Sequence, residues 1–315
     1  MTTDDEEPQT GGHKGTRTSD FGYSRRENHD SGRFYRQFAE LSVSTDSTLG
    51  YCELRNTVLQ GDARDLPEIP DNSVALVVTS PPYFAAKEYE TDDSGSSLQS
   101  FEGYIEMIED SIVECRRVLE PGGRIAINVA NIGRRPYRSL SAIVIRLLEE
   151  CGFLLRGEII WVKATGARGN VAWGSFRSAS NPVLRDVTER VIIASKGRFD
   201  RTPSRSEREK ANLPHVDTIS SEQFMDSTLD TWSIPPDSAK RVGHPAPFPV
   251  ELPRRLIELF TYKGDLVLDP FCGSGSTCLA ALQSGRDFIG VDLDESYVEL
   301  SRSRVAAFQP QLPEL

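Results

Sequence analysis

Residues 266–277, Leu-Val-Leu-Asp-Pro-Phe-Cys-Gly-Ser-Gly-Ser-Thr, place a carboxylate and a glycine turn directly after an apolar run. Gly273 and Gly275 let a backbone pass close to a ligand without a Cβ in the way. A dinucleotide fingerprint fits poorly, because Cys278 stands where its third glycine belongs. Asp269 can accept a hydrogen bond from a ligand ammonium group, which S-adenosylmethionine has and a nicotinamide dinucleotide lacks.

A second carboxylate follows the next strand pattern. Residues 288–291 are an apolar run that ends at Asp292. In doubly wound folds, an acid at the tip of the strand after a glycine loop commonly binds ribose hydroxyls. The two loops together therefore predict a nucleoside-type site, and an ordinary strand-to-helix turn is the alternative.

Residues 79–83, Thr-Ser-Pro-Pro-Tyr, directly follow another buried strand pattern. Pro81 and Pro82 fix the backbone and remove two N–H donors, so carbonyl oxygens are left to accept hydrogen bonds. Ser80 and the Pro81 carbonyl can draw an exocyclic amino group toward a pyramidal geometry, which exposes its lone pair to a methyl sulfonium. Tyr83 offers a flat face for a stacked base. A rigid turn with a packing tyrosine is the alternative, and the ligand loop elsewhere in the chain favours the catalytic interpretation.

This combination resembles the β-group amino-methyltransferases of DNA, in which the catalytic motif precedes the cofactor motif, as it does here. Serine at position 80 is typical of the cytosine-N4 enzymes, whereas adenine-N6 enzymes usually have Asp or Asn there. The resemblance spans roughly residues 56–306. It implies S-adenosylmethionine as cofactor, no metal, and double-stranded DNA as substrate, with the target cytosine flipped out of the duplex.

The resemblance also implies roles for particular side chains. Asp62 matches the position whose carboxylate contacts the cofactor adenine, and Phe248 lies in a segment similar to the one that closes over the methionine end. The implied catalytic residues are Ser80, Pro81, Pro82 and Tyr83. The implied cofactor-binding residues are Asp62, Phe248, Asp269, Phe271, Gly273, Gly275, Ser276 and Asp292.

A sheet must bring these loops together. Continuous apolar runs predict buried strands at 57–60, 74–78, 125–129, 158–162, 190–194, 266–268 and 288–291. Helical spacing of apolar residues predicts helices at 101–119, 139–151, 251–260 and 276–284. Strands alternating with helices indicate an α/β fold, a doubly wound and mostly parallel sheet. In the circularly permuted motif order, the strand ending at Asp62 should lie beside the strand ending at Asp292.

Two segments interrupt this alternation and are candidates for a small DNA-recognition insert. Segment 164–186 offers base-edge donors and an aromatic wedge, at Arg168, Asn170, Trp173, Arg177 and Arg185. Segment 198–240 has sparse apolar content, which suggests order only on DNA, and offers phosphate contacts at Arg201, Arg205 and Arg208. A solvated loop is the alternative for both. We expect residues 1–33 to form a disordered tail and 34–315 to form the methyltransferase domain.

The composition bears on how the protein could bind DNA and on its cellular environment. The net charge of −11 counts against a generally basic DNA-binding footprint. Only seven of the 36 basic residues are lysine, and an acidic, arginine-rich chain suggests a high-salt cytoplasm. The composition and the N-terminus further resemble archaeal halophile methylases that modify CTAG. Five scattered cysteines and the absence of any long apolar run favour a cytoplasmic protein without a membrane partner.

Several alternatives stay open at this point. An adenine-N6 methyltransferase with an unusual serine is the first. An RNA or protein amide methyltransferase is the second, although those usually have Asn before the prolines and the cofactor loop first. A DNA-binding module without catalytic activity is the third. The sequence leaves open a homodimer and a cognate restriction enzyme as partners.

Overall fold

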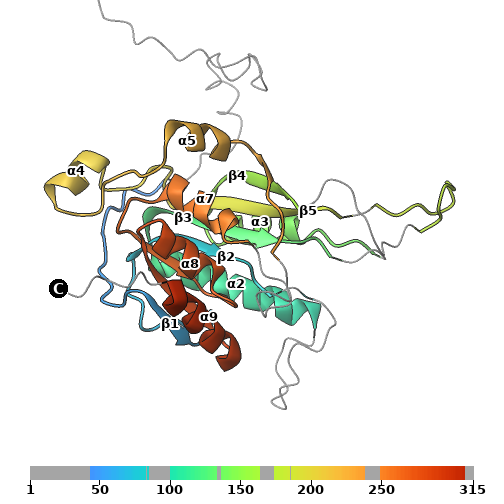
Figure 1. Cartoon of the computed structure of the whole chain (residues 1–315), viewed down its shortest axis with the longest axis horizontal. Helices are drawn as coiled ribbons and strands as arrows, with labels where there is room; N and C mark the ends of the chain where they lie inside the picture. The colour runs from blue at the N-terminus through green and yellow to red at the C-terminus, as the bar shows by residue number, and fades with distance from the viewer. Residues whose placement is uncertain are drawn as a thin grey trace, which may run out of the picture. The chain divides into compact units, whose positions relative to one another are not determined.

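The fold is built on one mixed sheet of parallel and antiparallel strands (Figure 1). The computed structural model describes residues 43–82, 84, 100–132, 136–163, 174–184, 186–237 and 249–308. Its strand order is β1-β8-β7-β2-β3-β5-β4-β6. The strands are β1 (Thr57–Gln60), β2 (Val74–Thr79), β3 (Leu119–Val129), β4 (Phe153–Val162), β5 (Thr188–Lys196), β6 (Thr231–Ser233), β7 (Leu266–Asp269) and β8 (Asp287–Asp292). The helices are α2 (Phe101–Val118), α3 (Leu140–Glu150), α4 (Arg205–Lys210), α5 (Ser221–Ser227), α7 (Glu251–Phe260), α8 (Ser276–Gln283) and α9 (Glu295–Phe308).

The strand pairing confirms the permuted order. β1 pairs in parallel with β8, which places Gln60 opposite Asp292. β2 lies between β7 and β3, with Val77 opposite Leu268 on one side and Ile125 on the other. The carboxyl ends of β1, β8, β7 and β2 therefore meet at one edge of the sheet, where doubly wound folds bind ligands. We call this the catalytic edge.

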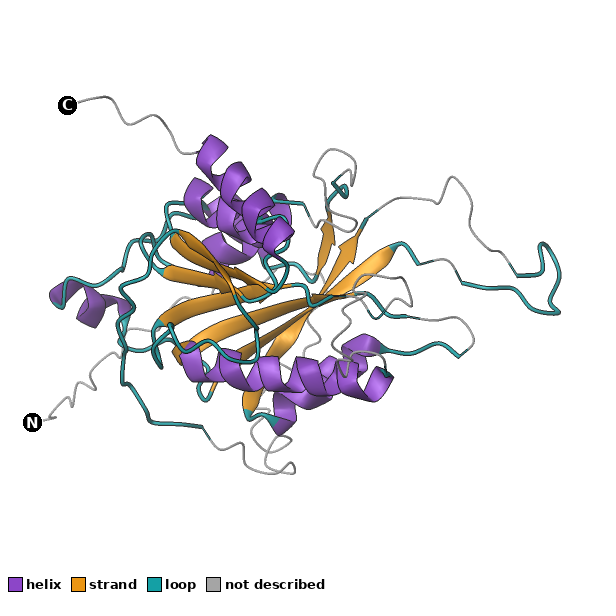
Figure 2. Ribbon diagram, turned by 90° about the horizontal axis from the view of Figure 1, so that it is seen from below, coloured by secondary structure: helices purple, strands orange, loops and turns teal. Residues whose placement is uncertain are grey.

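Helices cover both faces of the sheet, as Figure 2 shows. β2 is buried along its whole length, and its side chains alternate between the two faces. Val77 packs in the same apolar cluster as residues of α2 and α3. Leu76 and Val78 pack with residues of α7, α8 and α9 on the opposite face. Burial on both faces explains why the strand is a continuous apolar run and not an alternating one.

One helix end differs from the prediction. α2 begins after Ser100, whose hydroxyl accepts a hydrogen bond from the Gly103 amide at 3.0 Å. It ends at Val118, one residue before the predicted end, and β3 starts at Leu119, six residues before the strand predicted at 125–129. Gly122 has a φ of 76°, and a Cβ there would collide with the Asp200 carbonyl oxygen. This glycine is needed where the backbone after β5 crosses the start of β3.

The direction of β5 decides where the two candidate recognition segments emerge. β5 is antiparallel to both β3 and β4, so its first residues lie opposite the end of β3, with Arg190 facing Val129. Its last residues lie opposite the start of β3, with Ser195 facing Arg124. The end of β4 and the start of β5, which flank segment 164–186, therefore lie at the catalytic edge. The chain that follows β5 leaves at the opposite edge.

The segment after β5 corrects our expectation for 198–240. It forms α4 and α5, each starting with a capping box, and then β6, whose Trp232 is buried. Residues 198–237 thus have capped helices and a buried strand of their own, while residues 238–240 lie outside the described part of the chain.

Two of the three predicted phosphate contacts are wrong. The side chain of Arg201 is 8% exposed and pairs with Glu120 at 2.6 Å and with Asp265 at 2.7 Å. Arg208 is 2% exposed and pairs with the same Glu120 oxygen at 2.7 Å. Both guanidiniums are thereby committed to carboxylates at the edge opposite the catalytic one. Arg205 is exposed and its guanidinium lies 3.3 Å from the Asp217 carboxylate. It also belongs to α4 at the edge opposite the catalytic one, so we no longer expect it to contact DNA bound at the catalytic edge.

Other expectations fall outside what the structure describes, including the tail 1–33 and the start of the domain at 34. Over the described ranges, no helix combines the length and apolar character that crossing a bilayer requires.

Arg208→Ala should lower the free energy of unfolding by about 3–5 kcal/mol, because it leaves Glu120 short of one of its two buried cationic partners. Arg205→Ala is the matched control, and loss of its exposed ion pair should cost less than about 1 kcal/mol. Urea denaturation of both variants measures the difference. Similar values for the two arginines would contradict a structural role for Arg208.

Candidate active site

The end of β2 is tied directly to the end of β7. Thr79 is 3% exposed, and its hydroxyl donates to Asp269 Oδ1 at 2.7 Å. The proposed catalytic loop therefore starts from a residue in contact with the proposed cofactor carboxylate. Beyond it, Pro81 is buried and Pro82 is exposed, while Tyr83 lies outside the described residues.

Ser80 is half-buried and contacts the backbone near the end of β3. Its hydroxyl donates to the main-chain oxygen of Asn128 at 3.2 Å. The side-chain amide of Asn128 donates back to Ser80 Oγ at 3.4 Å. The hydroxyl proton is thus directed to the main chain and the Asn128 amide occupies one lone pair, which leaves the second lone pair of the oxygen to accept from a substrate.

Polar side chains continue this contact into the sheet. The Asn128 amide nitrogen, on β3, also donates to Glu189 Oε2 on β5 at 2.6 Å. The second oxygen of Glu189 accepts from Lys163 Nζ at 2.6 Å. Sequence reasoning missed Asn128, Glu189 and Lys163. The sequence signal was weak: Asn128 interrupts the apolar run 125–129, and Glu189 lies just before the apolar run 191–194. The structure buries both side chains, at 2% and 6% exposed.

Asp269 is a buried carboxylate with unused capacity. It is 1% exposed, and its Oδ1 accepts from Thr79 and, at 3.2 Å, from the Phe271 amide. Its Oδ2 is buried and has no hydrogen-bond partner among the described residues. Burial raises the pKa of Asp269 to about 6, against the lowering effect of the neighbouring donors. A cationic ligand group at Oδ2 would satisfy both the oxygen and its charge.

Asp292 holds the glycine turn against the tip of β8. Its Oδ2 accepts from the Gly273 amide at 2.7 Å, and its Oδ1 accepts from the Asp294 amide at 3.1 Å. Partial burial raises the pKa of this carboxyl above its ordinary value. A carboxylate oxygen has further lone pairs, so the two ligand hydroxyls of a ribose can be bound without releasing the turn.

Helix packing by itself requires a glycine at position 275. Gly275 precedes α8 with a φ of 77°, and a Cβ there would collide with Ser301 Oγ on α9. Close packing of α9 therefore requires this glycine even without a ligand, which adds to our sequence interpretation. Ser276 starts α8 and is buried, and its hydroxyl has no partner among the described residues. Phe271 is half-buried against the apolar cluster on the α2 side.

Asp62 lies at the tip of β1, next to Asp292. The adjoining Gly61 amide donates to the Asp292 carbonyl oxygen at 3.0 Å. The Asp62 carboxylate pairs with Arg64 at 2.6 Å, and this hydrogen bond lowers the pKa of Asp62. The structure thus places three carboxylates, on residues 62, 292 and 269, at the tips of the adjacent strands β1, β8 and β7.

The recognition residues are only partly described. Residues 174–184 project beyond the ends of β4 and β5 (Figure 1). They close on themselves through a Gly174–Pro182 bridge and hydrogen bonds between Ser175 and Asn181. Arg177 is exposed in this loop. The other predicted recognition residues of this segment lie outside the described residues: Arg168, Asn170, Trp173 and Arg185. The predicted cofactor residue Phe248 also lies outside them.

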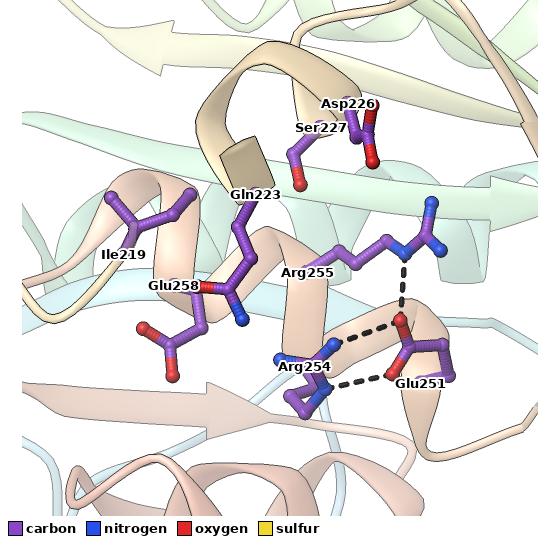
Figure 3. A pocket seen from close by; sticks show the side chains of 8 residues that line it. All are labelled: Ile219, Gln223, Asp226, Ser227, Glu251, Arg254, Arg255 and Glu258. Carbon is purple, nitrogen blue, oxygen red and sulfur yellow. Dashed lines mark hydrogen bonds and ion pairs between the residues drawn. The ribbon is translucent and has the colours of Figure 1, made fainter. Parts of the chain in front are cut away.

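A small pocket between α5 and α7 is separate from this site. Figure 3 shows Glu251 between Arg254 and Arg255, and both ion pairs are 2.7 Å long. Opposite charges inside the pocket neutralise one another, and none of the predicted cofactor residues lines it. The described ranges contain no cluster of three His, Cys, Asp or Glu side chains that suits a metal ion.

Comparisons with known proteins find DNA methylases among the proteins similar to this chain. The family model for N6/N4 methyltransferases, described as DNA methylases, matches residues 74–303. The Type II methyltransferase M.MjaI of Methanocaldococcus jannaschii is 29% identical over 290 residues, covering 81% of this chain and 92% of that protein. The Type II methyltransferase M.BglI of Bacillus subtilis is 28% identical over 308 residues, covering 81% and 86%.

Solved structures are similar as well. TTHA0409 of Thermus thermophilus, a candidate DNA modification methylase in complex with S-adenosyl-L-methionine, has a TM-score of 0.64 at 30% identity, covering 81% of this chain and 97% of that one. The cytosine-N4-specific PvuII DNA methyltransferase shares the fold, with a TM-score of 0.58 at 23% identity, covering 82% and 87%. S-adenosylmethionine is the cofactor, and the open oxygen of Asp269 fits its ammonium group.

Asp269→Asn should weaken S-adenosylmethionine binding by about 1–3 kcal/mol, because a neutral amide loses the charge-assisted hydrogen bond. Wild-type affinity should fall as the pH drops below about 6, where the Asp269 carboxyl takes up a proton. The limiting slope is about tenfold per pH unit for one proton, and the variant should lose this slope. Calorimetry across this pH range measures both effects.

The same substitution should not destabilise the ligand-free protein at neutral pH. The pKa of Asp269 is higher in the folded chain than its ordinary value of 3.8, so stability falls as the pH rises through that interval. The side-chain amide of the variant does not ionise, so the variant does not lose stability in this way. Asp287→Asn, at the other end of β8, is the control that should leave cofactor affinity unchanged. Equal affinities for wild type and Asp269→Asn would show that the ammonium binds elsewhere.

Proposed function

The chain belongs to the N6/N4 methyltransferase family of DNA methylases, and from that membership we propose that it methylates the exocyclic N4 of cytosine in double-stranded DNA. The observation that carries the proposal is the position of the neutral Ser80 hydroxyl. Ser80 directly follows Thr79, the last residue of β2, and the Thr79 hydroxyl contacts the carboxylate of Asp269. The target base is flipped out of the duplex, because an amino group inside the helix cannot reach the end of β2.

Ser80 acts as a neutral acceptor in this proposal. S-adenosylmethionine supplies a strongly electrophilic methyl group when bound. The amino lone pair of cytosine is delocalised into the ring, so the protein must favour a pyramidal nitrogen. Ser80 Oγ and the Pro81 carbonyl oxygen accept hydrogen bonds from the two amino N–H groups, and Tyr83 stacks on the base. This assistance grows toward the transition state, so it raises turnover more than it raises affinity.

Serine in place of a carboxylate supports cytosine over adenine as the target base. The adenine-N6 alternative shares every other feature of the site, so the methylated product decides between them. For this chain, a cognate restriction enzyme, a homodimer and CTAG as the recognition sequence are predictions. The relatives M.MjaI and M.BglI are both named as Type II methyltransferases.

DNA approaches the catalytic edge in this proposal. Segment 164–186 leaves the sheet there, between β4 and β5, and carries the exposed Arg177. The acidic net charge of −11 makes a general electrostatic footprint weak, so contacts from this one segment have to carry recognition.

Ser80→Ala should lower the rate of methyl transfer about a hundredfold or more, because it removes a preorganised acceptor. Cofactor and DNA affinity should change little, since the contact strengthens mainly in the transition state. Ser73→Ala is the matched control at the other end of β2, where the hydroxyl donates to the Pro70 carbonyl. Single-turnover transfer of a labelled methyl group measures the rate. Wild-type activity in Ser80→Ala would remove Ser80 from the reaction.

Arg177→Ala should weaken DNA binding by about 1–3 kcal/mol if this arginine reads a base edge. Arg205→Ala should leave DNA affinity unchanged, because α4 lies at the opposite edge of the sheet. Fluorescence anisotropy at several salt concentrations measures both. A larger loss of DNA affinity in Arg205→Ala than in Arg177→Ala would place DNA at the opposite edge of the sheet and contradict our proposal.

A further inference from the structure

We propose that Glu189 is a positioning residue for methyl transfer: its buried carboxylate orients the Asn128 amide, which in turn directs one lone pair of Ser80 at the target amino group. The inference rests on the proposed function, because it assigns the hydroxyl its acceptor role. It concerns three side chains, Asn128 on β3, Glu189 on β5 and Lys163 just after β4, that lie outside the catalytic motif.

The contacts form one continuous path. Lys163 Nζ donates to Glu189 Oε1 at 2.6 Å, and the Asn128 amide donates to Glu189 Oε2 at 2.6 Å. The same amide nitrogen lies 3.4 Å from Ser80 Oγ. Glu189 is 6% exposed and Asn128 is 2% exposed, so water does not replace these contacts. Each oxygen of the carboxylate thus has its own donor.

The carboxylate allows only one orientation of the amide. Both acceptors near the Asn128 side chain, Glu189 Oε2 and Ser80 Oγ, face its nitrogen. A turned amide would place its own carbonyl oxygen against the carboxylate, and two acceptors repel at that distance. The observed orientation leaves Asn128 Oδ1 buried without a hydrogen-bond partner in the described chain. An unsatisfied buried acceptor is uncommon, and here the stronger demand of Glu189 explains it.

The oriented amide restricts the serine hydroxyl. The Ser80 hydroxyl donates a hydrogen bond to the Asn128 main-chain oxygen, and the Asn128 side-chain amide donates to one of the two lone pairs of Ser80 Oγ. One lone pair therefore remains, and it has one direction. With the amide turned, the Asn128 side-chain oxygen would compete for the serine proton, and the hydroxyl could rotate between two acceptors. Glu189 thereby controls the direction in which Ser80 accepts, without touching the substrate.

Lys163 provides a way to separate this role from simple stability. Glu189→Gln replaces two acceptors with one acceptor and one donor. The Lys163 ammonium takes the remaining oxygen, so the introduced donor faces Asn128 and turns its amide. In the double variant Lys163→Met, Glu189→Gln, no ammonium holds that oxygen, which can again accept from Asn128. The original amide orientation should then return although the charge pair is gone.

The experiment measures single-turnover methyl transfer, the KM for DNA and the Kd for S-adenosylmethionine. The variants are Glu189→Gln, Lys163→Met and the double variant. Glu158→Gln is the matched control, on an exposed position of neighbouring β4. Glu189→Gln should lower the transfer rate between about 10-fold and about 100-fold, the scale for misplacing a reacting group. Its cofactor Kd and KM for DNA should stay within about twofold of wild type, since Glu189 is only 6% exposed and acts through Asn128.

Recovery in the double variant, to at least about fivefold above Glu189→Gln, supports the orientation account, because coupled residues are identified by such non-additivity. A wild-type rate in Glu189→Gln overturns the inference while leaving the proposed function intact. A slow Glu189→Gln that the Lys163 substitution does not rescue also overturns it, because a lost structural ion pair then explains the defect. A wild-type protein that transfers no methyl group to DNA defeats the proposed function itself.

Discussion

The hydrogen bond from Thr79 to Asp269 is the contact on which the site depends. It joins the ends of β2 and β7, which are 190 residues apart in the chain. The parallel pairing of these strands places Val77 opposite Leu268, and this register brings the two residues to the same level. The proposed cofactor and target loops consequently share one hydrogen bond. Any shift of one strand against the other would separate the methyl donor from its acceptor.

The two edges of the sheet use buried charge differently. At the edge away from the site, Arg201 and Arg208 neutralise Glu120 and Asp265, so both of these buried carboxylates have cationic partners. At the catalytic edge, Asp269 has no such partner among the described residues, and burial raises its pKa to about 6. A site that binds a cationic cofactor needs this deficit, because a resident arginine would compete with the ligand.

The sheet was predictable because its signals are local. Buried parallel strands are continuous apolar runs, and the position of Asp62 relative to Asp292 followed from motif order and strand pairing alone. Residue types also point to the proposed catalytic and cofactor loops, which the structure brings to one edge of the sheet. Only contiguous motifs give such information: in the sequence Thr79 is the first residue of the Thr-Ser-Pro-Pro-Tyr motif, and nothing local indicates its bond to Asp269.

Contacts between distant segments could not be predicted in the same way. Arg201 and Arg208 looked like phosphate ligands, since a sequence does not show that Glu120 and Asp265 lie at the same sheet edge. The antiparallel direction of β5, which sends that segment away from the site, also has no local signal. Asn128 and Glu189 stand out only once β3 and β5 are paired.

Mass spectrometry of nucleosides from duplex DNA, incubated with the full chain and isotopically labelled S-adenosylmethionine, tests the central claim most directly. A neutral serine at position 80, aligned with the cofactor through Thr79 and Asp269, predicts labelled N4-methylcytosine and no labelled N6-methyladenine. Labelled methyladenine alone would contradict the cytosine assignment, and unlabelled DNA would contradict the account of the site as a whole.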